Sequence, residues 1–143
     1  MRQINKIIVH CSDSDIPAHD DIETIRKWHV LENGWSDVGY HYFIQSNGNI
    51  QKGRDEARPG AHTRGHNQDS IGICLHGKNE FADTQFFALN TVIRSLLYAF
   101  PKAEIYGHRD FDNNKTCPNF DVNEKLNILD IPEKLKRINP KKI

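Results

Sequence analysis

The sequence predicts one α/β domain with a central mixed β-sheet of about five or six strands flanked by helices. Short apolar runs rich in β-branched residues recur along the chain, the first at Ile7-Ile8-Val9, and such runs favour strands. Segments with apolar residues at helical spacing lie between them, which favours helices that cover the sheet. The Asn47-Gly48 pair between two strand-like runs is a strong hairpin signal.

The first elements expected are a strand over residues 6–11, a polar loop over residues 12–21 and a helix. The helix begins near Asp20 or Asp21, because a carboxylate favours the positively charged end of a helix. It ends at Asn33-Gly34. Its buried side is expected to carry residues at helical spacing, namely Ile22, Ile25, Trp28 and then Leu31 or Glu32.

The middle of the chain predicts a hairpin, a long loop and a buried strand. Strands over residues 40–45 and 50–53 flank the turn at residues 46–49. The loop over residues 54–69 is long for a compact domain, and such loops are usually functional. The apolar run over residues 70–76 predicts a buried strand.

A second helix and a last strand are expected in the remaining third of the chain. Thr84 is expected to cap the helix, which runs to Phe100. The strand covers residues 103–106, and it therefore ends just before His108. From Asn123 the chain is expected to be helical in pieces. The side of the helix that faces the sheet is expected to carry Phe87, Val92, Ile93, Leu96 and Leu97.

Composition and charge exclude several classes of protein. At 143 residues the chain is long enough for one domain with a real core. Lys plus Arg and Asp plus Glu are both 19, so the net charge is zero and no broad basic surface is available for nucleic acid. No run approaches the roughly 20 apolar residues of a transmembrane helix, and the apolar run near the N-terminus is too short for a signal peptide. We therefore expect a cytoplasmic protein, and a monomer, since no pattern indicates a large exposed apolar face.

The three cysteines differ in their surroundings and do not form a disulfide framework. Cys11 and Cys74 lie inside apolar runs, where a thiol is usually a small buried apolar group. Cys117 follows a polar loop and precedes a proline. That place suits a metal ligand better than a core residue.

A candidate metal centre combines Cys117 with two histidines at strand ends. His10 ends the first predicted strand and His108 follows the last, and two strand ends can lie side by side in a sheet. Imidazole and thiolate ligands suit Zn²⁺, and three protein ligands leave a fourth position for water, which is the hydrolytic pattern. Cys11 is not expected to share the metal, because successive side chains of a strand point to opposite faces. Spacing alone leaves open that His10 is an ordinary core histidine.

A further signal comes from seven short segments between about Lys6 and Asp121. They occur in this order: Val9-His10-Cys11-Ser12, Asp37-Val38-Gly39-Tyr40-His41-Tyr42-Phe43, Gly60-Ala61-His62-Thr63, Gly65-His66-Asn67, Ser70-Ile71-Gly72-Ile73, Gly107-His108-Arg109-Asp110 and Lys115-Thr116-Cys117-Pro118. Together they resemble the zinc-dependent N-acetylmuramoyl-L-alanine amidases (amidase type 2), the family of the phage lysozyme-type amidases and the peptidoglycan recognition proteins.

The resemblance implies a zinc hydrolase. His10, His108 and Cys117 match the family's ligands for one Zn²⁺ per chain, Tyr40 matches its catalytic tyrosine, and Lys115 matches the catalytic lysine of the phage type. Zinc lowers the pKa of its water toward about 7 and polarises the scissile carbonyl. Lys115 would then stabilise the developing oxyanion, and Tyr40 would hold the attacking water or share in proton transfer.

Further roles follow from the same resemblance. His62, Thr63 and Asn67 lie in the loop where the family contacts its substrate, and Arg58 is a candidate for pairing with stem-peptide carboxylates. His41 and His66 are candidate supports for the metal ligands. The remaining histidines are expected to be structural or exposed, and Arg109 and Asp110 to form a local pair. Those histidines are His19, His29 and His76.

The implied activity is hydrolysis of the amide between N-acetylmuramic acid and L-alanine in peptidoglycan, by a single catalytic domain over residues 1–143 without a separate wall-binding domain. Phage or prophage lysis is the expected setting, in which another factor must let the enzyme leave the host cytoplasm. Two alternatives stay open: a cytoplasmic amidase that recycles wall fragments, and a module that binds peptidoglycan without cutting it. The basic end of the chain is expected to be a solvated face, with attraction to anionic wall polymer or lipid as the alternative; it contains Lys134, Lys136, Arg137, Lys141 and Lys142.

Overall fold

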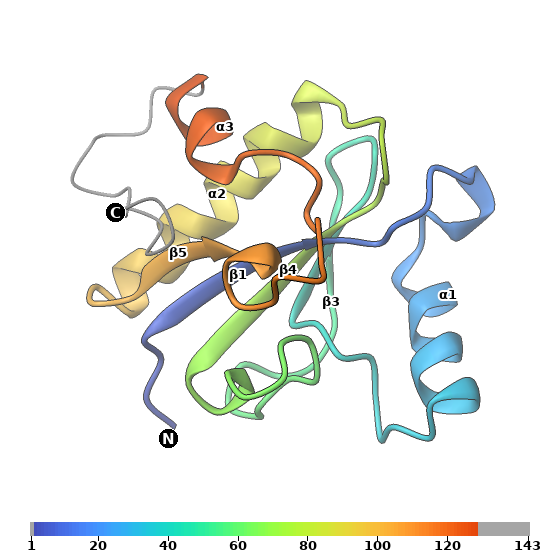
Figure 1. Ribbon diagram of the computed structural model, residues 1–143, viewed down its shortest axis with the longest axis horizontal. Coiled ribbons are helices and arrows are strands. Elements are labelled where there is room, and N and C mark those ends of the chain that lie inside the picture. The colour runs from blue at the N-terminus through green and yellow to red at the C-terminus, as the bar shows by residue number, and fades with distance from the viewer. Residues whose placement is uncertain (1, 129–143) are drawn as a thin grey trace.

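The computed structural model describes residues 2–128, which form a five-stranded mixed sheet with helices on both faces (Figure 1). This confirms the predicted fold class. The basic end of the chain lies outside the described residues. The strands are β1 (Lys6–Cys11), β2 (Tyr42–Ile44), β3 (Ile50–Lys52), β4 (Ser70–Leu75) and β5 (Glu104–Gly107), and the α-helices are α1 (Ile22–Lys27), α2 (Asp83–Ala99) and α3 (Val122–Ile128).

The order of the strands across the sheet is β3-β2-β4-β1-β5. β1 pairs in parallel with both β4 and β5, and β2 pairs in parallel with β4. Only β3, the return strand of the predicted hairpin, runs antiparallel to its neighbour. The carboxyl ends of β1, β2, β4 and β5 therefore meet at one edge of the sheet, which is where α/β proteins commonly place their sites.

Two apolar layers hold the helices to the sheet. The larger one packs α2 and α3 on one face, through residues such as Ile7, Ile73 and Leu89. The smaller one packs α1 on the other face, where Ile22 and Ile25 meet Phe43 and Cys74. Because both faces are covered, β1 and β4 are buried along almost their whole length, as continuous apolar strands of parallel sheets usually are.

The first helix begins where the sequence predicted. Asp21 is its N-cap, and its carboxylate accepts a hydrogen bond from the backbone N–H of Glu23 at 2.9 Å. The α-helix ends at Lys27 and continues as a π-helical turn (η2, Trp28–Glu32), in which the N–H of Asn33 donates to the carbonyl of Trp28. This wider turn changes the helical register, so Leu31 is 77% exposed and Glu32 is exposed too. Placing either residue on the buried side was wrong.

The second helix differs from the prediction at two positions. Its N-cap is Ala82, and the Thr84 hydroxyl instead donates to the carbonyl of Ser46 at 2.9 Å, which ties α2 to the hairpin turn. Phe87 is 59% exposed and does not face the sheet, whereas Phe86 does. Counting back seven residues, or two turns, from the buried Ile93 reaches Phe86.

The two faces of α2 give a direct test of the packing. Leu89 is fully buried, so Leu89→Ala removes core side-chain atoms and leaves a cavity. We expect this variant to lower the free energy of unfolding by about 2–5 kcal/mol. Phe87→Ala removes a larger but mostly exposed side chain and should change it by about 0.5 kcal/mol or less. Urea unfolding of both variants measures the difference, and equal losses would contradict the assigned helix face.

Candidate metal centre

His10, His108 and Cys117 meet at the carboxyl edge of the sheet. His10 is the penultimate residue of β1, and His108 directly follows β5, whose Gly107 pairs with Val9. Cys117 comes from the loop that returns after a 3₁₀ turn (η4, His108–Asp110), held by a hydrogen bond from the Arg109 N–H to the Cys117 carbonyl at 2.8 Å. The three ligand atoms all lie within 4.8 Å of one another.

The spacing and chemistry of these atoms fit zinc. The Cys117 Sγ lies 3.9 Å from the His10 Nδ1. A tetrahedral zinc with Zn–N near 2.0 Å and Zn–S near 2.3 Å holds two such atoms about 3.6 Å apart. Two imidazoles and one thiol are also a donor set that zinc prefers. The three residues thus form a candidate metal site open on one side.

The orientation of His10 is fixed by hydrogen bonds to its far nitrogen. Its Nε2 lies 2.9 Å from the Nδ1 of His62 and 3.2 Å from the Thr63 hydroxyl. If the His10 Nδ1 directs its lone pair at a metal ion, the ring proton is on Nε2. It is then donated to the His62 Nδ1 and the Thr63 hydroxyl. The His62 Nε2 then donates to the Ser70 hydroxyl at 3.3 Å, which in turn donates to the carbonyl of His66 at 2.7 Å. Each donor in this series of hydrogen bonds, from His10 through His62 to Ser70, therefore has an acceptor.

Burial keeps the histidines of the centre neutral. Desolvation lowers the pKa of His10 well below its ordinary value, and the neighbouring His62 and His108 lower it further. Burial also lowers the pKa of His62 and of His108. Neutral imidazole is the form that binds metal ions, so these shifts prepare the site for a cation.

The surroundings of Cys117 combine a thiol and a backbone donor. The backbone N–H of Cys11 donates to the Cys117 Sγ at 3.2 Å. The neighbouring Cys11 thiol, and then burial, raise the pKa of the Cys117 thiol. A bound cation opposes that shift because it favours the thiolate. Cys11 and Cys74 are both buried, as the sequence predicted.

Two glycines make room for His62. A Cβ at Gly72, in β4, would lie 2.5 Å from the His62 ring, and a Cβ at Gly60 would lie equally close. The loop that carries His62 is fixed by Asn67, whose side-chain oxygen accepts the backbone N–H groups of both His62 and Thr63 at 2.9 Å. Three of the four residues predicted to contact substrate, namely His62, Thr63 and Asn67, therefore also hold His10 in place.

Apart from His62, the other histidines make the contacts described below away from the three ligands. His41 was predicted to support a ligand, but its Nδ1 accepts the Gly72 N–H at 3.0 Å and its Nε2 donates to the Arg58 carbonyl at 2.8 Å. The His66 ring packs on Phe111, with ring centroids 4.2 Å apart. His62 and Thr63 perform the supporting role instead, which sequence spacing did not reveal. The remaining three are engaged elsewhere: His19 with Ser14, His29 with Gly39, and His76 buried after β4.

Two grooves meet at the metal centre. The larger, about 600 Å³, lies between Trp35, residues 61–67 and residues 111–115. The smaller, about 370 Å³, lies beside Tyr40 and Cys117. His108 and Lys115 line both. An extended substrate can therefore cross the metal centre with one part in each groove.

Lys115 lines both grooves, and Tyr40 lines the smaller one. The Tyr40 ring lies 5.2 Å from the His10 ring, centroid to centroid, and Tyr40 lines the smaller groove. Burial, and then the nearby cysteines, raise its pKa well above the ordinary value, so its hydroxyl stays protonated. Lys115 is exposed, and its ammonium group is available to a ligand in either groove.

Arg58 lies outside both grooves. Its guanidinium donates to the Ser36 hydroxyl at 3.1 Å and lies 3.9 Å from the Asp37 carboxylate. The arginine that lines the larger groove is Arg64, next to Thr63. Trp35 forms another wall and packs on His29 with centroids 4.5 Å apart. Neither residue was predicted, since nothing in the loop sequence distinguishes a groove wall from a solvated side chain.

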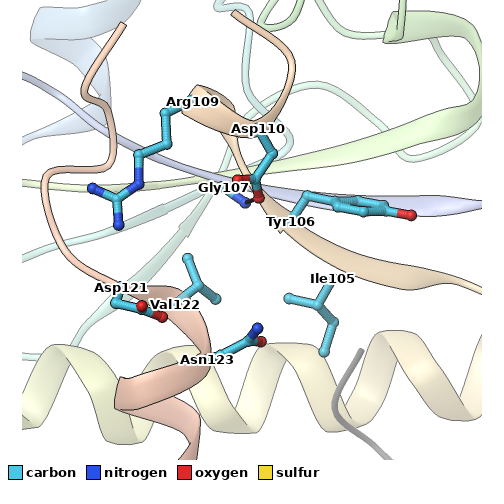
Figure 2. A pocket seen from close by; sticks show the side chains of 8 residues that line it. All are labelled: Ile105, Tyr106, Gly107, Arg109, Asp110, Asp121, Val122 and Asn123. Carbon is cyan, nitrogen blue, oxygen red and sulfur yellow. Dashed lines mark hydrogen bonds between the residues drawn. The ribbon is translucent and has the colours of Figure 1, made fainter. Parts of the chain in front are cut away.

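The 3₁₀ turn η4 (His108–Asp110), which follows β5, is also held by its last residue, Asp110. Figure 2 shows Arg109 and Asp110 extending in different directions from this turn. The buried carboxylate of Asp110 accepts the Gly107 N–H at 2.8 Å. The hollow beneath them, bounded by the start of α3, measures about 10 Å³. That is room for about one water, whereas the two larger grooves formed by the described residues lie on the His108 side of this turn.

Comparison with known proteins identifies the family and the fold. The model of the family described as N-acetylmuramoyl-L-alanine amidase matches residues 1–120. The chain belongs to this amidase family. The amidase is 37% identical over 129 residues to an endolysin of Enterobacteria phage K11, covering 85% of this chain and 84% of the relative. It is 36% identical over 124 residues to an endolysin of Escherichia phage T7, covering 81% of each.

A solved structure agrees with these relatives. The N-acetylmuramoyl-L-alanine amidase LysC from Clostridium intestinale URNW superposes with a TM-score of 0.80 at 26% identity, covering 92% of this chain and 88% of that one. The amidase is thus a peptidoglycan-cleaving enzyme of the phage endolysin type, as the sequence predicted. Over the described residues, no helix has both the length and the apolar character to cross a membrane.

The lowered pKa of the buried His41 predicts how the free energy of unfolding depends on pH. Burial lowers the pKa of His41 to about 4, whereas a histidine in an unfolded chain titrates near pH 6.5. Unfolding therefore takes up a proton between these values, and the free energy of unfolding falls as the pH drops from about 6.5 to about 4. Between pH 7.5 and pH 5, the free energy of unfolding of His41→Gln should fall by about 1–2 kcal/mol less than that of the unchanged protein. The reason is that one proton taken up on unfolding contributes up to about 1.4 kcal/mol per pH unit. Urea unfolding at the two pH values measures it, and an unchanged fall would show that His41 takes up its proton without unfolding.

Proposed function

We propose that this peptidoglycan amidase is zinc-dependent, with His10, His108 and Cys117 as the ligands of one ion. The observation that carries the proposal is the convergence of the three ligand atoms within 4.8 Å, with the far nitrogen of His10 already engaged by His62. A bound zinc ion supplies Lewis-acid polarisation of the scissile carbonyl and lowers the pKa of water. The fit of the donor set to zinc supports this assignment.

Lys115 is proposed to stabilise negative charge on the carbonyl oxygen. Its exposed ammonium lies where the two grooves meet, next to the ligand His108. A cation there is worth most when charge develops on the oxygen during attack on the amide. Hydrolysis breaks the carbonyl–nitrogen bond, and water supplies the hydroxyl of the new carboxyl group and a proton to the amine of L-alanine.

Tyr40 is proposed to act as a hydrogen-bond donor at the reacting atoms. Its raised pKa makes it a poor base, because the phenol does not readily lose its proton. A protonated phenol beside His10 instead orients water or the substrate through its O–H. Of the two roles considered for Tyr40 from the sequence, the protonated hydroxyl supports the one in which it holds water or substrate in place.

The substrate is proposed to lie across both grooves. His62, Thr63 and Asn67 form one wall of the larger groove while they hold His10. Arg64, in the same wall, is better placed than Arg58 to pair with carboxylates of the stem peptide. All these residues belong to one chain, which supports action as a monomer. The phage endolysins among the relatives support a host-cytoplasmic enzyme that reaches the wall at lysis.

Digestion of purified sacculi tests the zinc-dependent reaction. Mass spectrometry should find stem peptides with free N-terminal alanine and no new reducing sugar ends, and a zinc chelator should abolish their release. Cys117→Ser should lose both zinc and product while its circular dichroism stays native, since it is closed four-ligand structural sites that contribute folding energy outright. Unchanged release with the chelator present would refute zinc dependence. Cleavage of soluble wall fragments but not of sacculi would point to a recycling enzyme.

Lys115→Ala separates charge stabilisation from metal binding. Loss of one oxyanion partner should lower kcat about a hundredfold, while bound zinc, measured by elemental analysis, stays at one per chain. Lys27→Ala removes an exposed lysine on α1 and serves as the matched control, with kcat unchanged. A full rate for Lys115→Ala would remove the lysine from the mechanism.

A further inference from the structure

Tyr40, the proposed hydrogen-bond donor of the reaction, lies outside the hydrogen-bond ladder of the sheet. β2 begins at Tyr42 and pairs with β4 from that residue on, so the ladder does not fix Tyr40. A side chain that holds a reacting group has to be held in turn by its neighbours. The contacts around Tyr40 therefore decide where its hydroxyl lies.

His29 contacts both the Tyr40 ring and the backbone that precedes it. Its Nδ1 accepts the N–H of Gly39, the residue before Tyr40, at 2.8 Å. The rings of His29 and Tyr40 lie 5.6 Å apart, centroid to centroid. The Tyr40 ring lies 5.2 Å from the ring of His10. Tyr40 thus has two histidine neighbours: the metal ligand His10, and His29, which lines neither groove.

The π-helical turn η2 explains how His29 can hold two segments at once. In an α-helix the Asn33 N–H would donate to the carbonyl four residues back, which is that of His29. In η2 it donates to the carbonyl of Trp28 instead, at 3.2 Å. The His29 carbonyl then accepts the N–H of Trp35 at 3.0 Å, while its ring accepts that of Gly39. Such π-helical turns are frequent at functional sites.

Gly39 sits in a tightly packed segment that is held from two directions. A Cβ at Gly39 would collide with the carbonyl oxygen of Ala61 and would lie 3.0 Å from the Trp35 ring. The Gly39 carbonyl accepts the Ala61 N–H at 2.9 Å, and the Tyr40 carbonyl accepts the Arg54 N–H at 2.9 Å. The long loop therefore holds this segment by its carbonyl groups, and His29 holds it by an N–H.

The His29 ring is neutral near neutral pH, as an acceptor of this hydrogen bond has to be. Burial, and then the guanidinium of Arg54, lower the pKa of His29 to about 4. With Nδ1 as the acceptor, the ring proton is on Nε2. His29 is thus a permanent acceptor for Gly39 under the conditions in which the enzyme works.

We propose that His29 is a positioning residue for the amidase reaction, which keeps the Tyr40 hydroxyl at the metal centre by accepting the Gly39 N–H. It acts through Tyr40, because it lines neither groove. The inference rests on the role proposed above for Tyr40 and adds the residue on which the position of that hydroxyl depends. It gives a specific task to a histidine that the sequence predicted to be structural or exposed.

Two substitutions of similar shape isolate the hydrogen bond. Asparagine and leucine branch at the same carbon, but only the asparagine Oδ1 can replace the His29 Nδ1 as an acceptor. His29→Leu should lower kcat on solubilised peptidoglycan about tenfold or more, because small displacements of reacting groups are costly. His29→Asn should keep most of the rate. Equal losses in the two variants would overturn the proposal. His29→Ala takes the place of His29→Leu if the leucine variant does not fold.

A double substitution tests whether His29 acts through Tyr40. Tyr40→Phe removes the hydroxyl and keeps the ring. His29→Leu combined with Tyr40→Phe should have the kcat of Tyr40→Phe alone, within about a factor of two, since changes that act through one group do not add. Losses that multiply would show that His29 acts elsewhere and would overturn the proposal. His19→Ala removes a histidine that packs on Trp28 and is the control, with kcat unchanged.

Nuclear magnetic resonance of the zinc-loaded protein measures the position of Tyr40 without any reaction. Nuclear Overhauser cross-peaks between the ring protons of Tyr40 and His10 should be present in the unchanged protein and in His29→Asn, and weak or lost in His29→Leu. Full cross-peaks in His29→Leu would overturn the proposal. A full rate for Tyr40→Phe would instead refute the proposed role of the tyrosine, and the cross-peaks alone would then decide whether His29 positions its ring.

Discussion

The parallel pairing of β1 with β5 is the constraint on which the metal centre depends. It brings Val9 beside Gly107, so that the residues that follow, His10 and His108, leave the sheet at the same edge. Their rings then lie 4.6 Å apart, centroid to centroid. The two ligands are almost a hundred residues apart in sequence, and the backbone pairing between these strands brings them together. The buried layers on both faces of the sheet hold that pairing rigid.

A second level of organisation surrounds this pairing. The hydrogen bonds from His10 through His62 to Ser70 connect β1 to the start of β4 by way of the long loop. The loop after η4 adds Cys117, anchored to the backbone of Arg109 and Cys11. Each ligand is thus positioned by a different part of the fold. The site is preorganised, since no ligand has to move far to meet a cation.

The sequence predicted what depends on local pattern and failed where distant contacts decide. Apolar periodicity and the Asn47-Gly48 turn correctly placed the strands and the long helix, because those signals act over a few residues. The same pattern assigned Phe87 to the core, since two adjacent phenylalanines cannot be told apart without the register of α2 on the sheet. The π-helical turn after α1 has no comparable local signal and shifted Leu31 into solvent.

In the candidate site, too, some residues could be predicted from the sequence and others could not. His10, His108 and Cys117 could be proposed from residue type, strand ends and family resemblance, and the structure brings them together. The supporting role of His62 and Thr63 could not be predicted, because it depends on the space that Gly72 in β4 leaves for the His62 ring, and this contact forms only in the folded chain. Arg58 and Arg64 looked alike in the loop sequence, and only the folded loop separates the one paired with Asp37 from the one in the groove.

Gly72 has a consequence for any attempt to strengthen this fold. A glycine inside a strand is usually an easy target, because a side chain there restricts the unfolded chain and fills the sheet. In β4 the Cβ of such a replacement would lie 2.5 Å from the buried His62 ring, and displacing that ring would disturb the ligand His10. The usual gain from replacing a glycine in a strand is therefore lost at Gly72. A more heat-resistant enzyme has to be sought at positions that do not face the His62 ring.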